Sequence, residues 1–227
     1  MSVSKWKEYP EYKQSGELIG HLPSHWEVVP LKRYFAVQLG KMLQSQPKSD
    51  DDELQYYLKS VNIQWEGVSL KGLSKMWFSP KEMTKFRLLD GDLLISEGGD
   101  VGRSCIYSGT PEECYIQNAV NRVRAIDKVS TKFLYYWMKA IHSAGIIEII
   151  CNKSTIPHFT AEKVAEVRFF LPPVNEIEEI VKFLDKQYLL LSKMKNEWNM
   201  KIPLFDELYD ALVLNAVTGK IDVRKSV

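Results

Sequence analysis

Residues 98–104 (GGDVGRS) superficially resemble a phosphate-binding loop. A phosphate-binding loop has the pattern G-x-x-x-x-G-K-[ST], in which backbone amides surround the phosphates and the lysine contacts them. This segment lacks both the four-residue gap and the lysine. The segment therefore does not predict a nucleotide site, and we expect a glycine-rich loop that leads into a strand.

The other groups able to do chemistry lack the partners that they would need. Asp90, Asp92 and Glu97 are arranged like nuclease carboxylates, but no lysine follows at a suitable position. The four histidines lack metal-ligand spacing, and there is neither a Gly-x-Ser-x-Gly elbow nor a Cys–His pair. The (Asn/Asp/Ser)-Pro-Pro-aromatic tetrad of amino-group DNA methyltransferases is absent, because Pro172 and Pro173 lie between leucine and valine. We therefore expect no catalytic residue, no metal site and no cofactor bound by this chain.

The composition predicts a cytoplasmic protein with no membrane association. The 227 residues carry a formal net charge of +1 and are 45% hydrophobic, which allows one core-forming domain plus a helix. No apolar run has the length of a membrane span, and the N-terminus lacks the apolar core of a signal peptide. Cys105, Cys114 and Cys151 are unevenly spaced, as expected of free thiols in a reducing compartment.

The last quarter of the sequence predicts one long helix. Apolar residues recur there at alternating steps of four and three residues, with Lys195 as the polar exception. Asn175 is the expected N-cap, Gly219 the expected stop, and Pro203 the expected position of a kink. About 43 helical residues would span about 64 Å.

The apolar stripe of this helix predicts pairing with a second copy of the chain. A domain of this size covers only part of such a length, although a helix packed against its own domain is the alternative. The predicted dimerisation residues are Ile177, Val181, Leu184, Tyr188, Leu191, Trp198, Ile202 and Phe205.

The first 170 residues predict an α+β domain rather than a regular βαβ alternation. A turn at 90–91 precedes one expected strand, and a helix is expected over 130–145. Further expected elements are a short strand or turn at 26–31, strands at 54–60, 104–107, 115–126 and 167–171, and a helix-like stretch at 31–37. The predicted divisions are an N-terminal extension (1–20), a globular domain (21–172), a long helix (173–219) and a tail (220–227).

Several motifs resemble the specificity subunit of type I restriction-modification systems. The first is IGHLPSHWEV at 19–28, which follows an opening at 9–16 with the pattern Y-P-x-Y-K-x-S-G. The entry into the long helix resembles that of the family in Thr155-Ile156-Pro157, Phe159, Leu171-Pro172-Pro173, Glu176 and residues 180–185. The end of the long helix, VTGKIDVR at 217–224, resembles the corresponding segment of the family. The motifs occur in the family's order and extend over almost the whole chain.

The resemblance implies a target recognition domain over 21–172 that reads one half of a bipartite site in double-stranded DNA. It implies methyltransferase subunits, which use S-adenosylmethionine to methylate adenine N6, and restriction subunits, which use ATP and Mg. Family members usually contain two recognition domains and two conserved helices, whereas this chain has one of each. A half-length form is therefore expected, acting as an antiparallel homodimer on an inverted-repeat site. The alternative is a coiled-coil scaffold unrelated to DNA.

DNA recognition needs two kinds of side chain. Arg, Asn and Gln have paired groups that match base edges, whereas Lys, Arg and small polar residues contact phosphates. The residues that we predict to contact DNA are Lys59, Asn62, Gln64, Lys71, Lys75, Arg103, Ser104, Asn152, Lys153 and Ser154. Gln117, Asn118, Asn121 and Arg122 lie in a predicted strand, where they suit a polar core or a sheet edge equally well.

Overall fold

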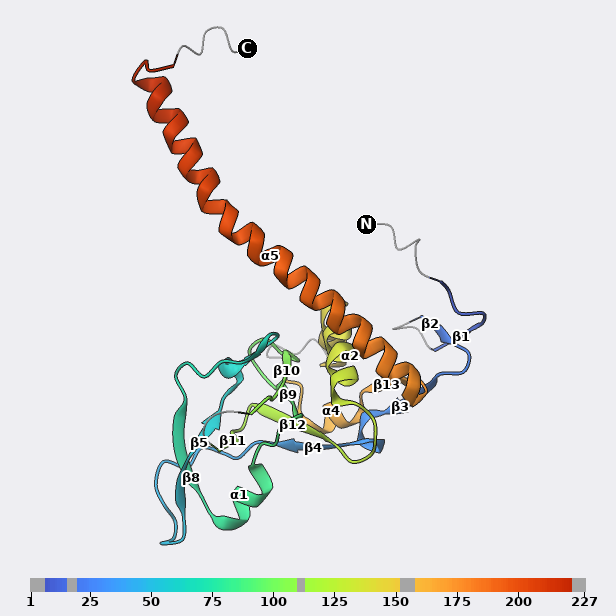
Figure 1. The fold of residues 1–227 in the computed structure, drawn as a ribbon. Coiled ribbons are helices and arrows are strands. Elements are labelled where there is room, and N and C mark those ends of the chain that lie inside the picture. Colours follow the sequence, from blue (N-terminus) through green and yellow to red (C-terminus); the bar gives the residue numbers. More distant parts are fainter. Residues whose placement is uncertain (1–6, 16–19, 110–112, 152–157, 222–227) are drawn as a thin grey trace. The chain divides into compact units, whose positions relative to one another are not determined.

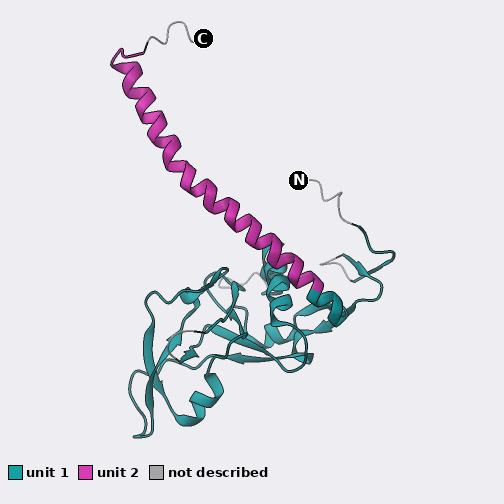
Figure 2. Ribbon diagram, in the orientation of Figure 1, with its two compact units in different colours: residues 1–178 teal, residues 179–227 magenta. Residues whose placement is uncertain are grey.

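The computed structural model describes residues 7–15, 20–109, 113–151 and 158–221. Two compact units divide the chain, a globular unit of residues 1–178 and a helical unit of residues 179–227 (Figure 2). Each unit is described by itself.

A four-stranded antiparallel sheet in the order β10-β9-β12-β4 forms the centre of the globular unit (Figure 1). Strand β9 is buried at every residue, because Leu93, Leu94 and Ile95 form a continuous apolar run that ends at the small Ser96. Val123 of β12 pairs with Leu93 and is also fully buried. The strands are β4 (Phe35–Leu39), β9 (Leu93–Ser96), β10 (Ser104–Ile106) and β12 (Val120–Ala125).

A second sheet has the order β11-β5-β8, with β11 parallel and β8 antiparallel to β5. Its buried side chains, which include Tyr57, Met76, Phe78 and Tyr115, form one apolar cluster. The strands are β5 (Glu53–Leu58), β8 (Ser74–Phe78) and β11 (Cys114–Ile116). Three further antiparallel pairs are β1 (Tyr12–Gln14) with β2 (His21–Pro23), β3 (Glu27–Pro30) with β13 (Arg168–Leu171), and β6 (Ile63–Gln64) with β7 (Gly67–Val68).

The helices of this unit begin at local sequence signals. Helix α1 (Pro80–Phe86) starts with a capping box between Ser79 and Glu82, and α2 (Thr131–Ser143) is capped by the hydroxyl of Ser130. Thr160 caps α4 in the same way. The remaining helical elements are η1 (Leu31–Arg33), η2 (Ser60–Asn62), α3 (Ile146–Ile150) and α4 (Ala161–Glu166).

The predicted α+β class is confirmed, and two of the predicted elements are wrong. The expected helix-like stretch at 31–37 is a short 3₁₀ turn followed by β4, because Phe35, Val37 and Leu39 alternate with other residues and pair with β12. The single strand expected at 115–126 is two strands, β11 and β12, which belong to different sheets.

Helix α5 (Val174–Val217) has 44 residues and continues across Pro203. It begins one residue before the predicted cap, and the carbonyl oxygen of Pro173 accepts the amide of Ile177 at 3.0 Å. Asn175 is therefore part of the first turn and is not the N-cap. Gly219 follows the end of the helix with φ of +71°, as predicted for a glycine stop.

Most of the predicted dimerisation stripe on α5 is exposed. Leu191 is 60% exposed, Trp198 58% and Phe205 59%. Tyr188 and Ile202 are exposed, and Val181 and Leu184 are half-buried. Ile177 is the exception at 2%, because its side chain is buried within the globular unit. Ile177 therefore belongs to the core and not to the exposed stripe.

No helix in the described part of the chain combines the length and apolarity required to cross a lipid bilayer. The three cysteines are buried free thiols, as the sequence predicted.

The first turn of α5 is joined to the N-terminal segment through one carboxylate. Glu176 accepts hydrogen bonds from Tyr9 Oη at 3.2 Å and Trp26 Nε1 at 3.0 Å, and lies 2.7 Å from His25 Nε2. Burial raises the pKa of Glu176, but the hydrogen bonds from Trp26, His25 and Tyr9 outweigh it and hold the pKa below its usual value. Two motifs that lie 150 residues apart in the sequence thus meet in space.

Replacing Glu176 with glutamine is expected to destabilise the globular unit by about 1–2 kcal/mol at neutral pH, because hydrogen bonds to a charged acceptor are lost. A lowered pKa in the folded state means that the contribution is complete above the unfolded-state pKa and is lost as the pH falls through the folded-state value. Thermal unfolding of both proteins between pH 7 and pH ~3 measures this. The difference in melting temperature between the wild type and Glu176→Gln should vanish at the acid end of this range. Glu179 is exposed, and the Glu179→Gln variant should show no comparable difference from the wild type.

Candidate nucleic-acid interface

Four loops of the globular unit are joined by hydrogen bonds into one surface, which we call the loop cluster. It consists of residues 40–43, 58–62, 96–104 and 116–120. The loops follow β4, β5 and β9 and connect β11 to β12. Segments far apart in the sequence are therefore fixed next to one another at the ends of both sheets.

The segment at 117–119 lies at the centre of the loop cluster. Four hydrogen bonds hold its main chain: Gln117 N to Leu58 O (3.1 Å), Asn118 N to Lys41 O (2.7 Å), Ser60 Oγ to Ala119 O (2.9 Å) and Glu97 N to Ala119 O (2.9 Å). Each of the other three loops contributes to them. The position of this turn is thus set by the whole cluster.

The backbone of the turn is also constrained sterically. Ala119 has φ of +88°, in the left-handed region that residues other than glycine rarely adopt. Gly40 lies so close to the turn that a Cβ atom there would be 2.3 Å from the carbonyl carbon and oxygen of Gln117. Only glycine allows this approach.

Two of the residues predicted to contact DNA lie in the loop cluster with their side chains accessible. Arg103 is half-buried, and its Nη atoms lie 3.3 Å from Asp100 Oδ2 and 3.3 Å from Ser60 O. Lys59 donates to Ser74 Oγ at 2.8 Å and lies 5.5 Å above the ring of Tyr57. Both cations are held by the fold in fixed positions.

Asn62 and Ser104 require correction, because their side chains are inside the protein. Asn62 is 1% exposed, and its amide accepts from Lys59 N and donates to Ser69 O and Lys71 O. Ser104 is fully buried and donates to Gly102 O at 2.8 Å. Both residues stabilise the loops and do not belong to an exposed contact surface.

The remaining predicted residues lie beside the cluster or outside the described part of the chain. Gln64 donates to Val61 O at 2.8 Å, Lys75 lies 4.3 Å above the ring of Tyr56, and Lys71 is exposed. Asn152, Lys153 and Ser154 lie outside the described residues, as does the Thr155-Ile156-Pro157 motif.

The sequence did not single out the turn at 117–119, because a continuous strand was expected there. The four polar residues considered in that strand divide into two pairs. Asn121 and Arg122 are buried, with Asn121 donating to Phe159 O and Arg122 to the carbonyls of Lys85 and Arg87. Gln117 and Asn118 are half-exposed on the turn. The sequence Gln117-Asn118-Ala119, two amides and an alanine within an apolar segment, is the one signal that could have located the turn between β11 and β12.

Two of the three carboxylates that resemble a nuclease set, Asp92 and Glu97, are surrounded by residues of the fold. Asp92 is 2% exposed and accepts two hydrogen bonds of 2.7 Å from Arg124 and one of 2.8 Å from Leu89 N. Burial raises the pKa of Glu97, which lies near His158 and Glu162. Within the described residues, no group of His, Cys, Asp and Glu is arranged to hold a metal ion.

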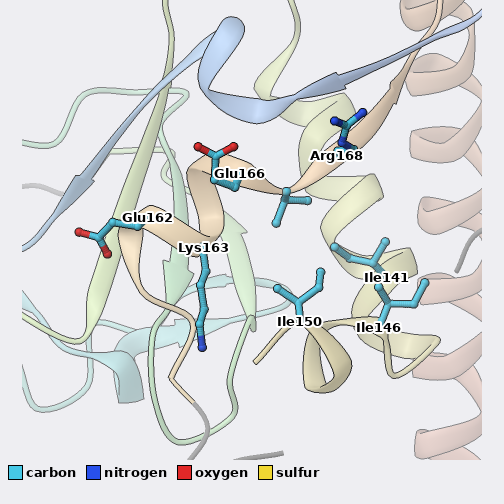
Figure 3. Close-up of a pocket in the computed structure, with 8 residues that line it drawn as sticks. Ile141, Ile146, Ile150, Glu162, Lys163, Glu166 and Arg168 are labelled. Atoms are coloured by element: carbon cyan, nitrogen blue, oxygen red, sulfur yellow. The ribbon is translucent and has the colours of Figure 1, made fainter. Parts of the chain in front are cut away.

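An apolar cavity of about 480 Å³ lies between α2, α3, α4 and β13 (Figure 3). Ile141, Ile146 and Ile150 line one side, and the side chain of Lys163 extends along the other. Lys163 donates to the carbonyl of His158 at 3.1 Å. None of the residues predicted to contact DNA lines this cavity.

The globular unit and the long helix define a class of protein, namely an α+β domain with an extended C-terminal helix and a loop surface rich in polar side chains. The chain belongs to the family described as "Type I restriction modification DNA specificity domain", whose sequence model matches residues 23–202. Specificity subunits of type I systems are non-catalytic DNA-recognition proteins. This membership agrees with the prediction of a chain without catalysis of its own, and it removes the scaffold alternative.

Three relatives illustrate the similarity. The putative type I restriction enzyme specificity subunit S.HindORF215P of Haemophilus influenzae is 32% identical over 132 residues, which are 55% of this chain and 32% of that protein. A chain from a structure concerned with complex assembly and conformational transition of the type I R-M system has a TM-score of 0.65 at 19% identity, covering 86% of this chain and 46% of the other. The HsdS subunit of Thermoanaerobacter tengcongensis has a TM-score of 0.55 at 18% identity, with coverages of 82% and 42%. The two solved structures show the same fold, and the matches span less than half the length of each relative.

Proposed function

We propose that this chain reads one half of a bipartite site in double-stranded DNA as the specificity component of a type I complex. The loop cluster is the observation that carries the proposal. It combines a main chain fixed by hydrogen bonds with accessible amide, cationic and apolar side chains, which are the groups that read base edges and contact phosphates. Arg103 and Lys59 are the proposed cationic contacts, with Gln64, Lys71 and Lys75 beside them.

We further propose that two copies pair through α5 with their helices antiparallel. The exposed stripe contains Leu191, Trp198 and Phe205, and a heptad stripe of this kind is normally buried against another helix. Two identical readers related by a twofold axis would recognise an inverted repeat.

Residues outside the stripe support a second partner, which we propose to be the methyltransferase subunit. Helices that are apolar on several faces are normally buried on several faces. The large apolar residues exposed on α5 outside the stripe include Leu189, Leu190, Met200, Leu204 and Leu214. In this proposal S-adenosylmethionine is bound by the methyltransferase subunit, and ATP and Mg by a restriction subunit where one is present.

Co-expression with a type I methyltransferase subunit, followed by methylome sequencing, tests the proposal. The expected result is methylated adenine in an inverted-repeat motif that disappears when this chain is omitted. Two unrelated half-sites, with no second specificity chain present, would contradict the homodimer. Absence of any methylated motif would contradict DNA reading.

The isolated chain is expected to bind DNA weakly and in a salt-sensitive way. Its net charge of +1 gives little overall attraction to DNA, and the phosphate contacts that it does make release counterions, which added salt opposes. Fluorescence anisotropy at several salt concentrations, with and without the methyltransferase subunit, measures this. Sequence-specific binding by the chain alone at nanomolar strength in physiological salt would show the expectation to be wrong.

A further inference from the structure

We propose that Gln117 determines specificity by reading a base edge, and that the turn at 117–119 is the structural element that positions it. The inference rests on the proposed function and assigns one step of it to one side chain. Gln117 is not among the residues that the sequence predicted to contact DNA.

The first argument is the way in which the turn is built. It leaves one sheet at Ile116 and enters the other at Val120, so both of its ends are anchored in strands (Figure 1). Hydrogen bonds from three other loops hold its main chain, and Gly40 packs against it from one side. Base reading requires a side chain whose main-chain position is fixed, and these contacts fix the main chain of Gln117.

The second argument is strain. Ala119 adopts φ of +88°, although glycine would adopt this conformation without a steric penalty. Residues held in such conformations cluster at ligand-binding and catalytic sites, where the surrounding structure fixes them. The strained residue here immediately follows Gln117 and Asn118, whose side chains are half-buried.

The third argument is that the side-chain amide of Gln117 is available. Gln117 is half-buried, and no other described residue forms a hydrogen bond with its side chain. By contrast, the amides of Gln44, Asn62 and Asn121 all make hydrogen bonds within the fold. A glutamine amide has a donor and an acceptor that match N7 and N6 of adenine in the major groove.

The fourth argument is the chemistry around the turn. Asn118 Nδ2 lies 2.8 Å from Met42 Sδ, and Met42 is 70% exposed. Leu43 and Val61, on segments that bond to the turn, are 59% and 67% exposed. Apolar side chains of this kind contact thymine methyl groups. Arg103 is joined to the turn through Ser60, which places a cation for a phosphate beside the amide.

Two substitutions at one position test the proposal, using the full chain with a type I methyltransferase subunit. Gln117→Ala should make one position of each half-site degenerate, lowering the preference for adenine there by about 5- to 160-fold. Gln117→Glu should shift the preference at that position towards cytosine, because a carboxylate accepts from cytosine N4. Methylome sequencing reads both outcomes.

The control is Gln55→Ala, which removes an amide that contacts Glu53 on the same strand and Met83 Sδ and that lies outside the loop cluster. Its motif should be that of the wild type. Thermal unfolding verifies that the variants are folded, and the Glu variant keeps the shape of the side chain. An unchanged motif in both folded Gln117 variants would overturn the inference and leave the proposed function standing. If the wild-type chain directs no methylation, the proposed function itself fails, and the inference with it.

Discussion

Replacing Gly40 with alanine is expected to destabilise the globular unit by about 3 kcal/mol or more, because the added methyl group overlaps the main chain. The new Cβ would lie 2.3 Å from the carbonyl carbon and oxygen of Gln117 and 2.8 Å from the carbonyl carbon of Ile116. Main-chain atoms cannot rotate away as a flexible side chain can. For a unit of this size the melting temperature should fall by about 6–12 °C in thermal unfolding followed by circular dichroism.

Gly98 provides a matched control within the same loop cluster. A Cβ atom there would meet nothing closer than His158 Nδ1 at 4.0 Å, and its φ is not in the left-handed region. Gly98→Ala should therefore leave stability unchanged or raise it slightly, because alanine reduces the freedom of the unfolded chain. Equal melting temperatures for the two variants would refute the close approach at Gly40.

Replacing Leu191 with glutamate is expected to dissociate the proposed dimer. The residue is 60% exposed and lies in the heptad stripe, so pairing would bury one carboxylate from each protomer without a partner. The dissociation constant should rise by at least about 100-fold, since an unpaired buried charge costs several kcal/mol. Sedimentation equilibrium of the purified chain measures it.

Leu190 is the control, because it is the same residue type, adjacent, 53% exposed and outside the stripe. Leu190→Glu should leave self-association unchanged. If both variants remain dimeric, the stripe is not the dimer interface. If both are monomeric, pairing uses a broader surface than the heptad pattern indicates.

The sequence predicts the periodic elements well, because periodicity reflects burial. The long helix, the helix capped by Ser130 and the strand after Gly91 all follow from the spacing of apolar residues and from local caps and turns. Short apolar runs are ambiguous, since a strand and a helix can both bury them. The stretch at 31–37 was resolved by pairing with β12, which local sequence cannot reveal.

The loop surface is less predictable, because residue type does not determine exposure. Asn62 and Gln117 are both amides near strand ends, yet one is buried with three hydrogen bonds and the other is half-exposed. That difference depends on which loops meet in space. The turn itself is defined by contacts with residues 40–41, 58–60 and 97, none of which is adjacent to it in the chain.

Main-chain atoms and the Ser60 hydroxyl hold the turn at 117–119, and the side chains of the turn add the contact of Asn118 Nδ2 with the exposed Met42 Sδ, so they contribute little to holding it in place. Codons 117 and 118 can therefore mutate at little energetic cost to folding. Natural drift, or a randomised library at these two codons, would generate new surface chemistry on an intact scaffold. In these three residues the main chain therefore serves folding, while the side chains at 117 and 118 are free to evolve new contacts.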